Sequence, residues 1–183
     1  MLEKVELVDK KNNGQGKNWR WPKEGLTRIP DWVYTSDEIF KRERERIFSG
    51  PTWNFVALEA EIPKPGTYKR SYVGDVPVIV SRTAENAIHV FENRCAHRGL
   101  EFCRALRGEA KEFICPYHHW TYNMAGKLVS VPFRRGDKGK GGMPDYFEMS
   151  EHNPRQLKVE TRHGVVFATF GEKIESLEDY LGP

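Results

Sequence analysis

Two short motifs constrain this chain more than any other feature: Cys95-Ala-His97 and Cys115-Pro-Tyr-His118. Each motif places one thiol and one imidazole a few residues apart, and seventeen residues separate His97 from Cys115. Thiolates and imidazoles are side chains that bind transition metals readily. If all four bind one metal centre, the fold must bring two loops face to face. We therefore expect a scaffold in which two tight turns between strands meet.

The distribution of the two ligand types indicates the kind of centre. Because each motif supplies one Cys and one His, two facing loops offer two sulfur and two nitrogen ligands. A [2Fe–2S] core with two Cys on one iron and two His on the other is the Rieske arrangement. Its oxidised form carries no net charge, so it accepts an electron more readily than a four-thiolate cluster. We expect the metal ligands to be Cys95, His97, Cys115 and His118.

A structural Zn²⁺ ion is the alternative, since tetrahedral sites with two Cys and two His are common. Zinc fingers, however, usually group Cys with Cys and His with His along the chain. The mixed motifs therefore favour the iron–sulfur cluster over zinc, and both over four unrelated structural residues. Metal analysis separates the two kinds of centre, because only the cluster contains iron and acid-labile sulfide.

The remaining thiol and imidazoles have less specific surroundings. Cys103 is expected to be a small buried hydrophobic residue. His119 follows His118 directly, but the Cys-x₂-His spacing selects His118 as the ligand. Structural or exposed roles are expected for the other histidines: His89, His152 and His163.

The surroundings of the motifs predict a mainly β fold. Short runs with alternating apolar residues, separated by Gly, Pro and Asn turns, are typical of a small antiparallel β-sandwich or barrel. Met124-Ala-Gly126 and Arg162-His-Gly164 are expected to be hairpin turns. Residues 132–156 are expected to have little regular structure, and residues 176–181 a helical turn. The predicted strands are residues 53–58, 67–73, 76–82, 87–91, 112–114, 120–123, 127–131, 157–161 and 165–170.

The region before the first strand is expected to differ in character. Residues 1–34 are polar and are interpreted as an arm, followed by a helix with Thr35 as N-cap and Glu38 completing a capping box. Its apolar residues are Ile39, Phe40, Ile47 and Phe48. We expect three segments: an arm and helix over 1–50, a Rieske domain over 51–172, and the start of a linker over 173–183.

Composition excludes several classes of function. The chain has 183 residues and a net charge of +3, with basic residues scattered rather than clustered, so no nucleic-acid partner is expected. No apolar run approaches the roughly 18–20 residues that span a bilayer, and the N-terminus lacks signal-peptide features. We expect a cytoplasmic protein with no membrane partner. An odd number of cysteines also argues for metal binding or burial rather than disulfides.

At Cys95-Ala-His-Arg-Gly99 and Cys115-Pro-Tyr-His-His-Trp120 the sequence resembles the large (α) subunits of Rieske non-haem iron ring-hydroxylating oxygenases. The similarity extends from Trp21-Pro-Lys-Glu-Gly-Leu-Thr-Arg-Ile-Pro30 to the end of the chain. Glu59-Ala-Glu-Ile-Pro63, Val131-Pro-Phe-Arg-Arg-Gly136 and Gly164-Val-Val-Phe-Ala168 resemble the salicylate 5-hydroxylase and anthranilate dioxygenase branch most closely. Respiratory-type Rieske proteins differ: where they have two disulfide cysteines and a serine, this chain has Leu100, Tyr117 and Trp120.

The resemblance implies a component of a mono- or dioxygenase that acts in the catabolism of aromatic compounds. It implies electron transfer from an NAD(P)H-dependent reductase or a ferredoxin to a mononuclear Fe(II), which a second catalytic domain binds. This chain is expected to lack that iron site, so the catalytic domain or other oxygenase subunits, in a homo-oligomer, would supply it. A stand-alone Rieske ferredoxin and a zinc-stabilised interaction module are the alternatives. The extra N-terminal residues favour the oxygenase portion, because a ferredoxin needs only the cluster-bearing core of roughly 100 residues.

Overall fold

A computed structural model describes residues 21, 23 and 25–182. Residues 1–20, which make up most of the predicted arm, lie outside the described residues. The chain divides into two compact units, Met1–Ile39 and Phe40–Pro183, and each is described by itself. Among the described residues, no helix has the length and apolar character to cross a bilayer.

In the first unit, short helical segments follow one another. They are η1 (Gly25–Thr27), α1 (Trp32–Thr35) and the start of α2 (Asp37–Glu43). The predicted capping box at Thr35 is wrong. Thr35 is the last residue of α1, and its hydroxyl donates to the carbonyl of Asp31 at 3.0 Å. A threonine that bonds back to the preceding turn is not available to cap the next helix, so α2 starts at Asp37 after the extended residue Ser36.

The second unit begins within α2, which continues into the π-helical segment η2 (Arg44–Phe48). Phe40 and Ile47 remain about half exposed, at 50% and 47%, whereas Phe48 packs against the apolar core. Gly74 makes room for Phe48: it has a φ of +60°, and a Cβ there would lie 2.8 Å from the Cβ of Phe48. Part of the predicted apolar stripe is therefore left uncovered within this unit.

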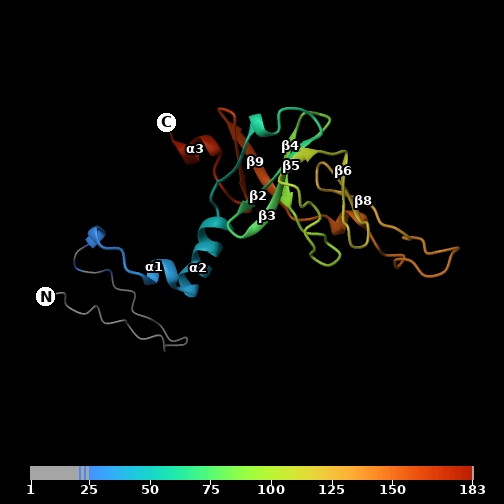
Figure 1. The fold of residues 1–183 in the computed structure, drawn as a ribbon, viewed down its shortest axis with the longest axis horizontal. Helices are drawn as coiled ribbons and strands as arrows, with labels where there is room; N and C mark the ends of the chain where they lie inside the picture. The colour runs from blue at the N-terminus through green and yellow to red at the C-terminus, as the bar shows by residue number, and fades with distance from the viewer. Residues whose placement is uncertain (1–20, 22, 24, 183) are drawn as a thin grey trace. The chain divides into compact units, whose positions relative to one another are not determined.

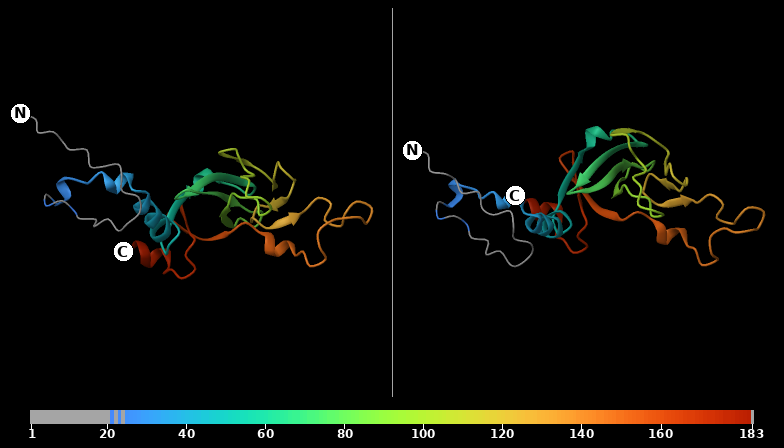
Figure 2. Two further views of the ribbon diagram at one scale, coloured as in Figure 1. Left: turned by 90° about the horizontal axis from the view of Figure 1, so that it is seen from below. Right: turned by 60° about the horizontal axis from the view of Figure 1, so that its bottom comes forward.

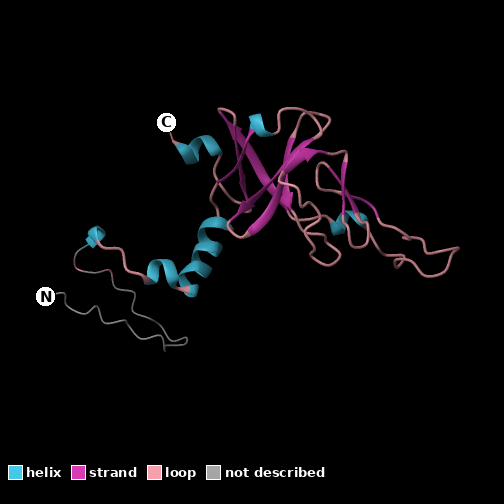
Figure 3. Ribbon diagram, viewed as in Figure 1, coloured by secondary structure: helices cyan, strands magenta, loops and turns pink. Residues whose placement is uncertain are grey.

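The rest of the second unit is antiparallel β-structure (Figures 1 and 3). Within the described residues, a seven-stranded sheet has the order β1-β10-β9-β4-β3-β2-β5, and a three-stranded sheet has the order β6-β7-β8. The predicted mainly β fold class is confirmed. The strands are β1 (Asn54–Leu58), β2 (Thr67–Val73), β3 (Val76–Arg82), β4 (Ile88–Glu92), β5 (Arg107–Glu109), β6 (Glu112–Ile114), β7 (Thr121–Asn123), β8 (Leu128–Ser130), β9 (Gln156–Arg162) and β10 (Val165–Thr169).

Three short helices complete the unit: η3 (Glu59–Glu61), η4 (Met149–His152) and α3 (Leu177–Leu181) among the described residues. The predicted C-terminal turn is confirmed as α3, where the Ser176 hydroxyl accepts from the Asp179 amide at 3.1 Å. The small sheet lies at one end of this unit and α3 at the other, as the three views agree (Figures 1 and 2).

Strand β3 separates two apolar cores. Alternate residues of a strand point to opposite faces, so Ile79 enters one core while Val78 and Val80 enter the other. The first core also contains both Cys95 and Cys115. The seven-stranded sheet thus presents one face to the small sheet and to the loops that carry the two motifs.

Two parts of this architecture differ from the sequence predictions. Strand β5 was not predicted, because Arg107-Gly-Glu109 has no apolar residue; it forms by pairing with β2. Residues 132–156 are more regular than predicted. Asp137 and Lys140 form a backbone bridge around a two-residue turn in which Lys138 and Gly139 have φ of 49° and 77°. The η4 turn then follows in the same region.

Candidate functional site

The first motif lies in the connection between β4 and β5. Cys95 is buried, at 3% exposure, and its backbone N–H and C=O both bond within the tight turn that follows it. Its amide donates to the carbonyl of Leu100 at 2.8 Å, and the amide of Gly99 donates back to the Cys95 carbonyl at 2.7 Å. Gly99 has a φ of 71°, a conformation that glycine adopts without strain. His97 lies within this turn and is half-buried.

The second motif forms the same turn between β6 and β7. The amide of Cys115 donates to the carbonyl of Trp120, and the amide of His119 donates to the carbonyl of Cys115, both at 2.9 Å. His119 therefore occupies the position that Gly99 occupies in the first turn, with a φ of 55°. Its side chain is exposed, whereas that of His118 is half-buried.

The two turns bring the candidate ligands together by kind. The imidazole rings of His97 and His118 have centroids 4.6 Å apart at an angle of 71°. On the buried side, desolvation raises the pKa of the Cys115 thiol, and the adjacent thiol of Cys95 raises it further, while the backbone amides of Tyr117 and His118 lower it. The arrangement is thus two pairs, and among the described residues no larger group of His, Cys, Asp and Glu gathers around one point.

Burial also acts on the imidazole pair. Desolvation lowers the pKa of His97, and the neighbouring His118 and Arg98 lower it further, so the neutral ring is favoured. The Nδ1 atom of His118 is buried and has no hydrogen-bond partner among the described residues. A buried polar nitrogen without a partner costs free energy, unless a metal ion accepts its lone pair.

Residues 52–147 match the family model of the Rieske [2Fe–2S] domain, and this range includes both motifs. The chain belongs to the Rieske [2Fe–2S] domain family. It is 51% identical over 168 residues to the large oxygenase component of salicylate 5-hydroxylase from Ralstonia sp., covering 90% of this chain and 40% of that protein. It is 50% identical over 162 residues to the large subunit of anthranilate 1,2-dioxygenase from Burkholderia cepacia, covering 88% of this chain and 38% of that subunit.

Among solved structures, naphthalene 1,2-dioxygenase from Rhodococcus sp. aligns with a TM-score of 0.74 and 37% identity, over 84% of this chain and 34% of that one. The chain spans about two fifths of the length of the salicylate 5-hydroxylase and anthranilate 1,2-dioxygenase large components. Its Rieske domain matches those of aromatic-ring oxygenase large subunits, and the predicted resemblance is confirmed.

The residues present fit a Rieske cluster. Each iron of the cluster takes two protein ligands, because the bridging sulfides fill its other positions, and the chain offers one thiol pair and one imidazole pair. The unpartnered Nδ1 of His118 is a donor atom suited to iron. The buried thiols must lose their protons to bind, and the charge of bound iron would favour that loss.

The aromatic residues beside the motifs are placed differently from one another. Trp120 is 4% exposed, and its indole stacks on the His97 ring. Tyr117, by contrast, is 57% exposed and its ring is tilted against that of His118, so it gives little shelter from water.

Sequence reasoning missed Tyr122 on β7. Its hydroxyl accepts from the amide of Ala96 at 3.0 Å and lies 3.3 Å from the Sγ of Cys95. Burial raises the pKa of this phenol, and the bond to Cys95 raises it further. The alternation along the strand, two residues after Trp120, predicts an inward side chain. The contact with the other motif depends on the packing of β7 beneath the first loop, which no local pattern reveals.

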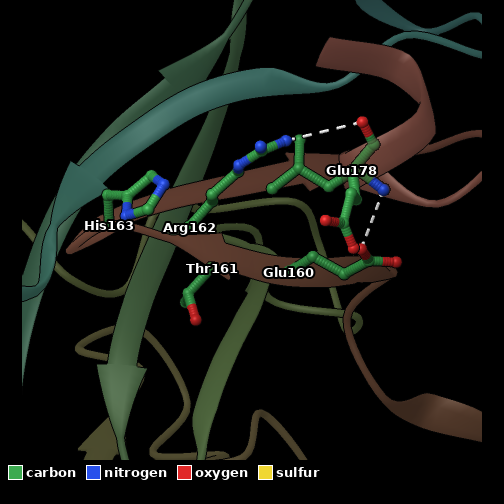
Figure 4. A pocket seen from close by; sticks show the side chains of 6 residues that line it. Glu160, Thr161, Arg162, His163 and Glu178 are labelled. Carbon is green, nitrogen blue, oxygen red and sulfur yellow. Dashed lines mark hydrogen bonds between the residues drawn. The ribbon is translucent and has the colours of Figure 1, made fainter. Parts of the chain in front are cut away.

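The remaining histidines lie on separate elements: His89 on β4, His152 in η4 and His163 in the β9–β10 turn. A surface hollow of about 380 Å³ adjoins that turn (Figure 4), lined by Glu160, Thr161, Arg162, His163, Leu177 and Glu178. Arg162 there donates to the carbonyl of Glu178 at 3.4 Å, and Glu160 accepts from the amide of Leu177 at 2.8 Å. These bonds fasten α3 to β9, and none of the candidate metal ligands lines the hollow.

Proposed function

We propose that Cys95 and Cys115 bind one iron of a Rieske [2Fe–2S] cluster and that His97 and His118 bind the other. The observation that carries this proposal is the pairing by kind, with the imidazoles 4.6 Å apart and the thiols adjacent in the core. A single zinc ion would need all four side chains around one point.

The thiol pair and the imidazole pair differ in their exposure to solvent, and this difference suits electron transfer through the imidazole side. The cluster, when bound, supplies one-electron transfer. The core side chains around Cys95 and Cys115 exclude water from the thiolate end. His97 and His118 are half-buried at the rim of the same site, so the imidazole end is the one that an electron-transfer partner can approach. Trp120 restrains the ring of His97 against rotation.

We further propose that the chain is the electron-transfer portion of an aromatic-ring-hydroxylating oxygenase that acts on aromatic acids. The names of the relatives, salicylate 5-hydroxylase and anthranilate 1,2-dioxygenase, support that class of substrate. In this proposal residues 51–172 carry the cluster, after an arm and helix over 1–50 and before a linker that begins at 173. Electrons come from an NAD(P)H-dependent reductase or a ferredoxin. They pass to a mononuclear iron that a catalytic domain or a neighbouring oxygenase subunit provides.

Metal analysis of the anaerobically purified chain tests the first step. The expected result is iron and acid-labile sulfide in equal amounts, with reduction by NADH through an added reductase. Zinc without sulfide would contradict the cluster and favour an interaction module.

A further inference from the structure

The two cluster loops differ in how their ends are held. The second loop continues the ladder between β6 and β7, with Ile114 opposite Thr121 and Phe113 opposite Tyr122. The first loop cannot do so. Its flanking strands β4 and β5 are separated in the sheet by β3 and β2. Beyond the turn that Cys95 closes, a different element must therefore fix the position of the first loop.

The side chain of Asn93 connects the two ends of the first loop, which no strand pairing joins. Its side chain is fully buried and lies two residues before Cys95. The Nδ2 atom donates to the carbonyl of Cys103 at 2.7 Å, and the Oδ1 atom accepts from the amide of Cys103 at 3.0 Å. One carboxamide thus pairs with both backbone groups of a single residue, as an opposing strand residue does in a hydrogen-bonded antiparallel pair.

The location of this bond pair matches the ladder of the other loop. Asn93 precedes Cys95 by two residues, just as Phe113 precedes Cys115 by two. The main chain of Asn93 is itself anchored, because its amide donates to the carbonyl of Pro77 on β3 at 2.8 Å. A buried amide is costly unless both of its ends are bonded. The bonds to Cys103 therefore join the start of the loop, its end and the central sheet.

We propose that Asn93 is a positioning residue for the cluster: its carboxamide replaces the missing strand ladder and so holds Cys95 and His97 opposite Cys115 and His118. This inference rests on the proposed ligand set. Tyr122 complements Asn93 at the tip of the loop through the Ala96 amide. If Asn93 only stabilised the fold, replacing it would lower the unfolding temperature without changing the cluster.

The test compares Asn93→Ala and Asn93→Asp with the matched control Asn153→Ala in the full chain. Asn153 makes the same kind of bond pair elsewhere, accepting from the Leu128 amide at 2.8 Å and donating to the Ser150 carbonyl at 2.9 Å. Substituting the residues that orient metal ligands costs about 10–100-fold in metal affinity. We expect Asn93→Ala to lose iron to a chelator about tenfold faster, with broadened or shifted paramagnetic-resonance lines and an altered reduction potential.

Asn93→Asp keeps the acceptor for the Cys103 amide and is expected to give an intermediate rate of iron loss. Asn153→Ala is expected to lower the unfolding temperature while leaving the spectrum, the potential and the rate of iron loss unchanged. An Asn93→Ala protein that matches the wild type in these three readouts overturns the proposal, as does an equal effect of Asn153→Ala. If Asn93→Ala does not accumulate, the Asn93→Asp protein decides by the same criteria.

A wild-type chain without a Rieske signal would instead overturn the proposed function. In that case, amide hydrogen exchange over residues 95–103, compared between the purified wild type and Asn93→Asp, still tests whether the Asn93 carboxamide holds the first loop. Faster exchange in Asn93→Asp would support it, and equal exchange would overturn it as well.

Discussion

The indole ring of Trp120 lies flat on the imidazole of His97, with ring centroids 5.0 Å apart and planes 10° from parallel. Phe147 holds the indole from the side, with its ring edge-on to Trp120 at 5.8 Å. A buried aromatic ring therefore occupies the position at which the resemblance places a serine hydroxyl in respiratory-type proteins. Trp120 has no hydroxyl to donate to a cluster sulfur, and its indole lies on the face of the His97 ring.

This difference predicts a reduction potential at the lower end of the Rieske range, of order −150 mV. Fewer hydrogen bonds to the sulfurs stabilise the reduced cluster less, because reduction adds negative charge. Voltammetry of the purified chain provides the measurement. A clearly positive potential would show that other donors compensate for the missing hydroxyl.

The Tyr122 hydroxyl is one such donor when Cys95 is a metal-bound thiolate, which can only accept, so Tyr122→Phe should lower the potential further. The hydroxyl lies 3.3 Å from the Sγ of Cys95. A hydrogen bond contributes about 1 kcal/mol, which for one electron corresponds to a decrease of about 40 mV. Tyr146→Phe is the control, since Tyr146 is 83% exposed. An unchanged potential in Tyr122→Phe would mean that its hydroxyl bonds only to the Ala96 amide.

The equivalent positions of the two turns, Gly99 and His119, predict opposite effects on stability. Gly99→Ala places a Cβ at a φ of +71° where no atom lies within 4 Å, so the cost is backbone strain of about 1–2 kcal/mol. His119→Gly removes the same strain but adds backbone entropy to the unfolded chain, for a net gain of at most about 1 kcal/mol.

Thermal unfolding measures both changes, at about 2–4 °C per kcal/mol for a chain of this size. Gly164→Ala, at a φ of +79° in the β9–β10 turn, is the control that should cost as much without touching the site. If His119→Gly is destabilised as strongly as Gly99→Ala, the two turns are not equivalent.

Several features of the fold could be predicted from the sequence because they depend on local patterns. The strand pattern predicted the bounds of β2 and β3, residues 67–73 and 76–82, and the structure has the same bounds. The spacing of Cys and His within the two motifs predicted the two loops that carry them. Strand β5 could not be predicted, since it has no apolar residue and forms only by pairing with the edge of β2.

The supporting residues of the site were missed for a related reason. Asn93 and Tyr122 contact residues 10 and 27 positions away. A polar residue near a motif carries no sign of such a partner until the chain is folded. The start of α2 was misplaced at Thr35 because a hydroxyl can bond either to the next helix or to the turn before it, as it does here.

The chain alone is predicted to accept electrons but to hydroxylate nothing. Attack of O₂ on an aromatic ring requires an open-coordinate iron beside the substrate, and the histidines outside the motifs lie on separate elements. The assay supplies salicylate, anthranilate and related acids with a reductase and NADH. Reduction of the cluster without product is expected. Product formed without any other iron protein would contradict the electron-transfer proposal.

The central claim is the identity of the four ligands, and paramagnetic resonance of the reduced protein tests it most directly. His97→Ala and His118→Ala should each abolish the Rieske signal, because either change removes one of the two nitrogen ligands of the histidine-bound iron. His119→Ala should leave the signal nearly intact, since the His119 side chain is exposed. A wild-type signal in either of the first two variants, or its loss in His119→Ala alone, would contradict the assignment.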